Sequence, residues 1–97
     1  MKAIQGYALR EKIHESERTL VYRAVREADG APVILKLLWQ EQPTPGEIAR
    51  YGREYEVLSR FDYPGIIRAF ALEWQKGRPA LVMEDAGARS LAALLAE

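Results

Sequence analysis

Two apolar segments separated by an Asp-Gly pair constrain the fold of this chain most strongly. Residues 19–26 and residues 32–39 are rich in valine, isoleucine and leucine, and Asp29-Gly30 lies between them. This dipeptide is favoured in β-hairpins because both central residues of the tight turn adopt positive φ angles. We therefore predict two antiparallel strands here. A further strand over residues 7–13, followed by a polar turn at 14–18, completes a three-stranded meander.

A helix is predicted to follow, because three start signals occur together. Thr44 suits the N-cap, Pro45 suits the first helical position, and Glu47 completes a capping box. An apolar stripe at helical spacing extends the helix to about residue 59 or 61 and consists of Ile48, Tyr51, Tyr55 and Leu58. Glu54 falls at the edge of that stripe, about 80° from its centre. Its carboxylate is therefore expected to reach along the packed sheet.

The remaining segments predict two more strands, at residues 66–74 and 78–84, after a turn at 62–65. The resulting β-β-β-α-β-β order predicts an α+β fold, a five-stranded antiparallel sheet with one packed helix. Residues 90–97 are typical of the start of a further helix with no C-terminal stop signal. We therefore expect the chain to be the front part of a longer protein.

Composition excludes several classes of function. The chain has 97 residues, enough for one small domain spanning 1–97, with a formal net charge of zero and no cysteine. A neutral surface gives no reason to expect nucleic-acid or membrane binding. Disulfides and thiolate metal sites are excluded, and the single histidine, His14, cannot build a zinc site alone. Residues 1–6 lack the apolar core of a signal peptide, so we expect a cytoplasmic protein.

Lys36 and Glu54 are the candidate functional pair. Lys36 closes the apolar run 33–36, and Glu54 follows inside the predicted helix. A lysine at a strand end can hold nucleotide oxygens, and a helix carboxylate can hold the lysine. Two plainer interpretations stay open. Lys36 could be a solvated surface lysine, and Glu54 could pair with Arg50 on its own helix, a contact worth a few tenths of a kcal/mol.

The order of the elements, with the motifs in place, resembles the N-terminal lobe of eukaryotic-type serine/threonine protein kinases. The motifs are Val33-Ile34-Leu35-Lys36, Arg53-Glu54-Tyr55-Glu56-Val57-Leu58, Tyr63-Pro64-Gly65-Ile66 and Leu81-Val82-Met83-Glu84. A closer resemblance is to large bacterial signalling proteins that join a kinase domain to an ATPase module and a sensor histidine kinase of two-component systems. That resemblance depends on Leu20-Val21-Tyr22-Arg23, residues 32–38 and Pro43-Thr44-Pro45.

The resemblance implies an ATP site. Lys36 would contact the α- and β-phosphates and pair with Glu54, and Met83 would be the gatekeeper. In the hinge, the backbone carbonyl of Glu84 and the backbone N–H of Ala86 would hydrogen-bond adenine. The apolar roof over the adenine ring would consist of Ile13, Val21 and Ile34.

One departure from the kinase pattern is large. Kinases carry Gly-x-Gly-x-x-Gly before the roof valine, and the corresponding positions here are His14, Ser16 and Thr19. Side chains at these positions hinder close approach of the backbone to phosphates. Phosphate contacts are then expected from the hydroxyls of Ser16 and Thr19. Ile34 is a smaller departure, since alanine is usual there, and it should crowd the adenine roof.

The catalytic loop and the magnesium-binding segment follow the hinge, residues 84–89, in kinases. We expect the magnesium ligands in the C-lobe of the parent protein, and we expect the 97-residue chain alone to transfer no phosphate. The expected partners are ATP, a protein substrate, the C-lobe and downstream signalling domains. One alternative is a pseudokinase-like regulatory or binding module. Another is an interaction domain that self-associates through its exposed lobe interface.

Overall fold

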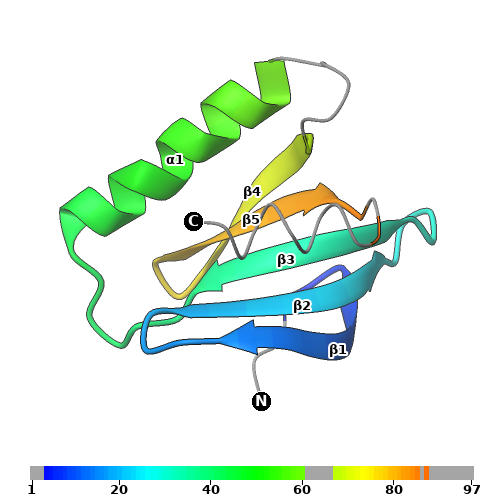
Figure 1. Ribbon diagram of the computed structural model, residues 1–97, viewed down its shortest axis with the longest axis horizontal. Coiled ribbons are helices and arrows are strands. Elements are labelled where there is room, and N and C mark those ends of the chain that lie inside the picture. The colour runs from blue at the N-terminus through cyan, green and yellow to red at the C-terminus, as the bar shows by residue number, and fades with distance from the viewer. Residues whose placement is uncertain (1–3, 61–66, 86, 88–97) are drawn as a thin grey trace.

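The computed structural model describes residues 4–60, 67–85 and 87 (Figure 1). Its elements follow the predicted order. They are β1 (Tyr7–Glu15), β2 (Thr19–Arg26), β3 (Pro32–Leu38), α1 (Pro45–Arg60), β4 (Ala69–Gln75) and β5 (Arg78–Glu84). The predicted turn at 62–65, the start of a helix at 90–97 and Ala86 lie outside the described residues.

The strands form one five-stranded sheet in the order β1-β2-β3-β5-β4. Every neighbouring pair is antiparallel. Helix α1 packs against β4 and β5, on one side of the sheet in Figure 1. This architecture confirms the predicted α+β fold.

Four predicted strand boundaries are wrong by one to three residues. β1 continues to Glu15, because His14 and Glu15 still pair with Val21 and Leu20 of β2. β3 ends at Leu38, one residue before the predicted end. β4 begins at Ala69, three residues after the predicted start at 66, and ends at Gln75, one residue after the predicted end. The two β4 corrections and the β1 correction reflect pairing with the neighbouring strand, which composition does not encode.

Turns join β2 to β3 and β4 to β5 as predicted, but at Asp29-Gly30 only the glycine has a positive φ angle. Gly30 has a φ of 72°, and its N–H donates to the carbonyl of Arg26 over 2.7 Å. Lys76 and Gly77, between β4 and β5, have φ angles of 52° and 78°. Two consecutive positive φ angles are typical of a type I′ turn, whose twist matches that of the flanking strands.

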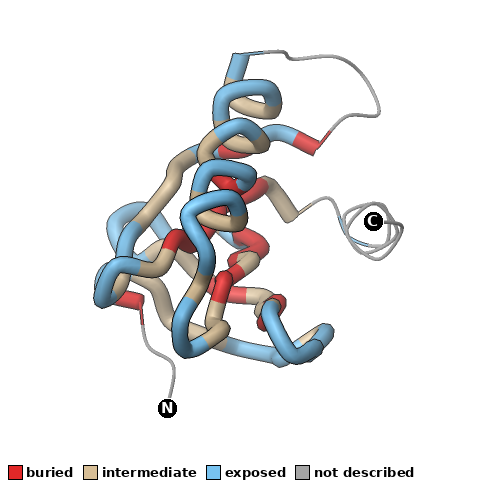
Figure 2. The backbone as a smooth tube through the Cα atoms, turned by 90° about the vertical axis from the view of Figure 1, so that its left-hand side faces the viewer, coloured by how far each residue is buried: buried red, intermediate tan, exposed pale blue. Residues whose placement is uncertain are grey.

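β3 is buried on both faces, which explains its nearly continuous apolar sequence. Val33, Leu35 and Leu37 belong to one apolar cluster, and Ile34 and Leu38 belong to the other. The second cluster includes the predicted helical stripe, in which Tyr51 is buried and the other three members are partly buried: Ile48, Tyr55 and Leu58. Buried segments therefore lie mostly between α1 and the sheet and along the central strands (Figure 2).

The sheet is curled, since side chains of its two edge strands reach each other. Tyr7 of β1 donates its phenol hydrogen to Oε2 of Glu73 on β4 over 3.0 Å, although these strands are at opposite ends of the sheet order. Ile4 is buried in the same cluster as Leu35 and Leu37. One cluster therefore fills the inside of the curl, and the other lies under α1, where the candidate site is found.

Candidate phosphate-binding pocket

Lys36 lies on the α1 side of the sheet. Side chains alternate along a strand, so Lys36 shares a face with Ile34 and Leu38, which pack under α1. Its Nζ is 3.6 Å from Oε2 of Glu54 on α1. The two side chains are only 11% and 22% exposed. The structure thus brings together the two residues that the sequence proposed as a pair.

Tyr51 completes the surroundings of the lysine. It precedes Glu54 by three positions, so both side chains leave the same face of α1. The Nζ of Lys36 lies 5.6 Å from the centre of the Tyr51 ring, within the range of a cation–π contact. A carboxylate and an aromatic face from α1 therefore both lie beside the Lys36 ammonium.

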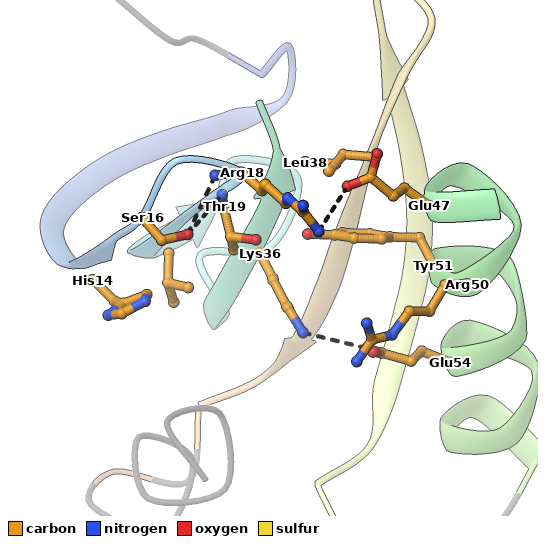
Figure 3. Close-up of a pocket in the computed structure, with 11 residues that line it drawn as sticks. His14, Ser16, Arg18, Thr19, Lys36, Leu38, Glu47, Arg50, Tyr51 and Glu54 are labelled. Atoms are coloured by element: carbon orange, nitrogen blue, oxygen red, sulfur yellow. Dashed lines mark hydrogen bonds and ion pairs between the residues drawn. The ribbon is translucent and has the colours of Figure 1, made fainter. Parts of the chain in front are cut away.

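A pocket of about 340 Å³ opens beside this pair (Figure 3). It is lined by His14, Ser16, Arg18, Thr19, Val21, Lys36, Leu38, Glu47, Arg50, Tyr51 and Glu54. Three of these side chains are lysine or arginine, and two are carboxylates. The excess of positive charge, in a space at the small end of the range for ligand pockets, suits a small polyanion.

The turn between β1 and β2 forms one wall of the pocket and is closed by its own hydrogen bonds. Oγ of Ser16 accepts from the N–H of Arg18 over 3.3 Å and from the N–H of Thr19 over 3.1 Å. The N–H of Ser16 donates to the carbonyl of Thr19 over 2.9 Å. The sequence resemblance predicts a glycine-rich loop's position at this turn, and here a serine side chain holds the backbone together.

Trp39 anchors the same turn from the end of β3. Its backbone N–H donates to the carbonyl of Arg18 over 2.9 Å, and its indole Nε1–H donates to the carbonyl of Ser16 over 3.4 Å. The turn is therefore tied to the sheet at two points. These bonds restrict the backbone of the turn, whereas a glycine-rich sequence would make it more flexible.

Arg18 connects this turn to α1. Its Nη1 is 3.6 Å from Oε2 of Glu47. Glu47 also completes the predicted capping box, because its Oε1 accepts from the N–H and the hydroxyl of Thr44 over 3.0 Å each. The Thr44 N–H holds the pKa of Glu47 below its ordinary value, and the Thr44 hydroxyl and the Arg18 guanidinium add to that effect. Glu47 is therefore a charged contact between the helix start and the turn.

Of the described residues predicted to contact adenine, Val21 lines this pocket and the others do not. Ile34 pairs with Met83 across β3 and β5, and their exposed fractions are 0% and 2%. Ile13 packs against the same cluster. A ring could reach Ile34 and Met83 only if neighbouring side chains moved. Ala86 is outside the described residues, so the hinge contact stays a prediction.

Glu84 ends β5, as predicted, and its side chain has a structural contact. Its Oε1 accepts from the N–H of Arg68 over 3.0 Å, and its own N–H donates to the Arg68 carbonyl over 2.9 Å. These bonds fix the start of the hinge against the segment before β4. The adenine contact of the Glu84 backbone carbonyl stays a prediction.

The sequence argument did not assign Arg50 or Tyr51 to the site. Arg50 lies four positions before Glu54, and Tyr51 lies three positions before Glu54. Helical spacing alone therefore places all three on the same face of the helix. The same spacing also fits an intrahelical pair of Arg50 with Glu54 and a core stripe that includes Tyr51, so it does not by itself indicate a site. Leu38 was not singled out, because an apolar residue at a strand end has no distinguishing pattern.

The described residues contain no group of three or more histidine, cysteine, aspartate and glutamate side chains arranged to hold a metal ion. Over the same ranges, none of the helices has the length and apolarity needed to cross a membrane.

The curled sheet with a single packed helix is consistent with the N-lobe of a protein kinase. Among solved structures that match, one is the apo form of PpkA-294, a bacterial serine/threonine kinase, with a TM-score of 0.70. The two sequences are 15% identical, and the match covers 86% of this chain and 36% of that chain. A likeness at this identity shows a kinase-like fold. No protein-family model and no curated protein matches the chain.

Proposed function

We propose that this chain is the ATP-binding N-lobe of a serine/threonine protein kinase and that the pocket beside Lys36 receives the phosphates. The single observation that carries the proposal is the 3.6 Å contact between Lys36 Nζ and Glu54 Oε2. A lysine that is largely buried in a strand needs a nearby carboxylate, and a phosphate-binding lysine needs its rotamer fixed.

The pocket supports a polyanion as its occupant. Lys36 and Arg50 approach it from β3 and α1, while Arg18 approaches from the turn. Bound ATP would supply the phosphoryl group, and the roles of these residues are to bind and orient its oxygens. The magnesium ligands, the catalytic base and the protein substrate would belong to a C-lobe, and signal transduction through downstream domains is part of the same proposal.

The alternative is a pseudokinase-like regulatory module. The closed turn favours it, because the N–H groups of Ser16, Arg18 and Thr19 donate within the protein. A backbone that is already hydrogen-bonded offers fewer donors to phosphates. This alternative predicts a folded chain with weak or no ATP binding.

Calorimetric titration of ATP into the Lys36→Met variant tests the proposal. Methionine is similar in length to the lysine stem but carries neither the charge nor the N–H donors. We expect ATP affinity to fall at least about tenfold, the scale of one charge-assisted contact. Lys76→Met is the matched control, since Lys76 lies in the β4–β5 turn and should leave affinity unchanged.

Equal ATP affinity for the wild-type chain and Lys36→Met would refute the role of Lys36. A folded wild-type chain that binds no ATP would instead favour the regulatory module. In a parent protein with a C-lobe, undiminished phosphorylation by Lys36→Met would contradict the enzyme reading.

A further inference from the structure

The closed β1–β2 turn changes which groups can meet a phosphate. The N–H groups of Arg18 and Thr19 donate to Ser16 Oγ, and the N–H of Ser16 donates to the Thr19 carbonyl. Breaking these bonds to bind a ligand would leave Ser16 Oγ and the Thr19 carbonyl without those donors, which costs free energy. Side chains of the turn are therefore the groups left to contact a polyanion.

Arg18 is the strongest candidate among these side chains. Its guanidinium presents planar donors that match two phosphate oxygens at once, which a serine or threonine hydroxyl cannot do. Arg18 lines the pocket, and its side chain is 69% exposed. Trp39 binds the carbonyls of Arg18 and Ser16, so the backbone that carries the guanidinium is held in place.

The contact that now holds Arg18 is easy to exchange. Its Nη1 lies 3.6 Å from Glu47 Oε2, longer than the roughly 2.7–2.9 Å of a strong charge-assisted hydrogen bond. Exposed pairs of this kind contribute little to stability. Glu47 keeps its bonds to Thr44 when the arginine leaves. A phosphate can thus replace Glu47 as the partner of Arg18 without loss of the helix cap.

We propose that Arg18 determines the specificity of this pocket for polyphosphates, moving from Glu47 onto the phosphates in place of the backbone donors of a glycine-rich loop. This inference rests on the proposed nucleotide function. Its consequence is that affinity rises with the number of phosphates. The adenosine part of a nucleotide contributes independently of Arg18, because Arg18 is not among the predicted adenine contacts.

The test compares Arg18→Gln and Glu47→Gln with the wild-type 97-residue chain. Each is titrated calorimetrically with inorganic tripolyphosphate, ATP and adenosine. We expect Arg18→Gln to bind tripolyphosphate and ATP about tenfold more weakly, with adenosine affinity unchanged. Glutamine can still complete the capping box. Glu47→Gln should therefore bind tripolyphosphate several-fold more tightly, because the competing charge is gone. Circular dichroism verifies that each variant is folded.

The outcomes separate this inference from the proposed function. If ATP binds and Arg18→Gln binds it as well as wild type, Arg18 is not the specificity residue, and the nucleotide function stands. A second outcome is that tripolyphosphate binding depends on Arg18, while ATP binds no better than tripolyphosphate and adenosine does not bind. In that case the role of Arg18 in binding polyphosphates stands, and the nucleotide function falls. A wild-type chain that binds neither tripolyphosphate nor ATP overturns both.

Discussion

Lys36 is a charged residue in a strand whose other central side chains are fully or nearly fully buried. The ammonium has Glu54 Oε2 at 3.6 Å and the centre of the Tyr51 ring at 5.6 Å. Both partners come from α1, so the pair is a tertiary contact between sheet and helix. With side-chain exposures of 11% and 22%, this pair is screened by salt less than a surface pair is.

Removing the two charges one at a time should have unequal effects on stability. In Glu54→Gln the ammonium loses the adjacent negative charge but stays largely buried, and we expect the free energy of unfolding to fall by about 1 kcal/mol. In Lys36→Met an apolar side chain takes the same place, so we expect a change close to zero. Urea unfolding measures both. A larger loss in Lys36→Met than in Glu54→Gln would contradict the tertiary pair.

The sequence was sufficient to propose this pair and to predict the turn that faces it, but not the closure of that turn. Lys36 stands out because it ends an apolar run with a charge, and Glu54 because it lies at the edge of the apolar stripe of the helix. The closure of the β1–β2 turn depends on the rotamer of Ser16 and on Trp39, which is 23 positions away. Such bonds follow from the fold and have no local periodicity by which they could be predicted.

Helix α1 positions Glu54, and the start of α1 is fixed by the Thr44–Glu47 capping box. The N–H of Glu47 donates to Thr44 Oγ1 over 3.2 Å, reciprocating the bonds that Glu47 accepts. Sequence predicted this element well, because the N-cap, the first-turn proline and the capping glutamate are local signals. The strand edges were less well predicted, because they depend on pairing with another strand.

Thr44→Ala should destabilise the chain by about 1 kcal/mol, the usual cost of losing an N-cap side chain. Thr44→Ser is the matched control, since its hydroxyl can make the same bonds, and it should lose only a small fraction of that. Thermal and urea unfolding of both variants give the comparison. Equal stability of Thr44→Ala and wild type would mean that the observed cap does not stabilise α1.

At the scale of the whole molecule, the bond between Tyr7 and Glu73 joins the two edges of the sheet. It links β1 to β4 across 66 positions of sequence. Burial, then the hydrogen bond to Glu73, raise the pKa of Tyr7 to about 12. No sequence pattern indicated this contact, because the curl of the sheet brings together residues from its opposite edges.

Tyr7→Phe should lower the free energy of unfolding by about 1 kcal/mol near neutral pH, the typical value of one hydrogen bond. Unfolded tyrosine ionises near pH 10, below the pKa of Tyr7 in the fold. The contribution of the neutral Tyr7 phenol to the free energy of unfolding is therefore fully present below about pH 10 and is lost as pH rises toward 12. Urea unfolding from pH 8 to 11.5 should show the difference between wild type and Tyr7→Phe shrinking above pH 10. A difference that is independent of pH over this range would contradict the raised pKa.

The most direct test of the phosphate-binding pocket is a crystal structure of the chain with a non-hydrolysable ATP analogue. The account predicts phosphate oxygens within hydrogen-bonding distance of Lys36 Nζ, with Glu54 still beside the ammonium. An analogue bound elsewhere, or a pocket without bound phosphate at a saturating concentration of the analogue, would contradict it.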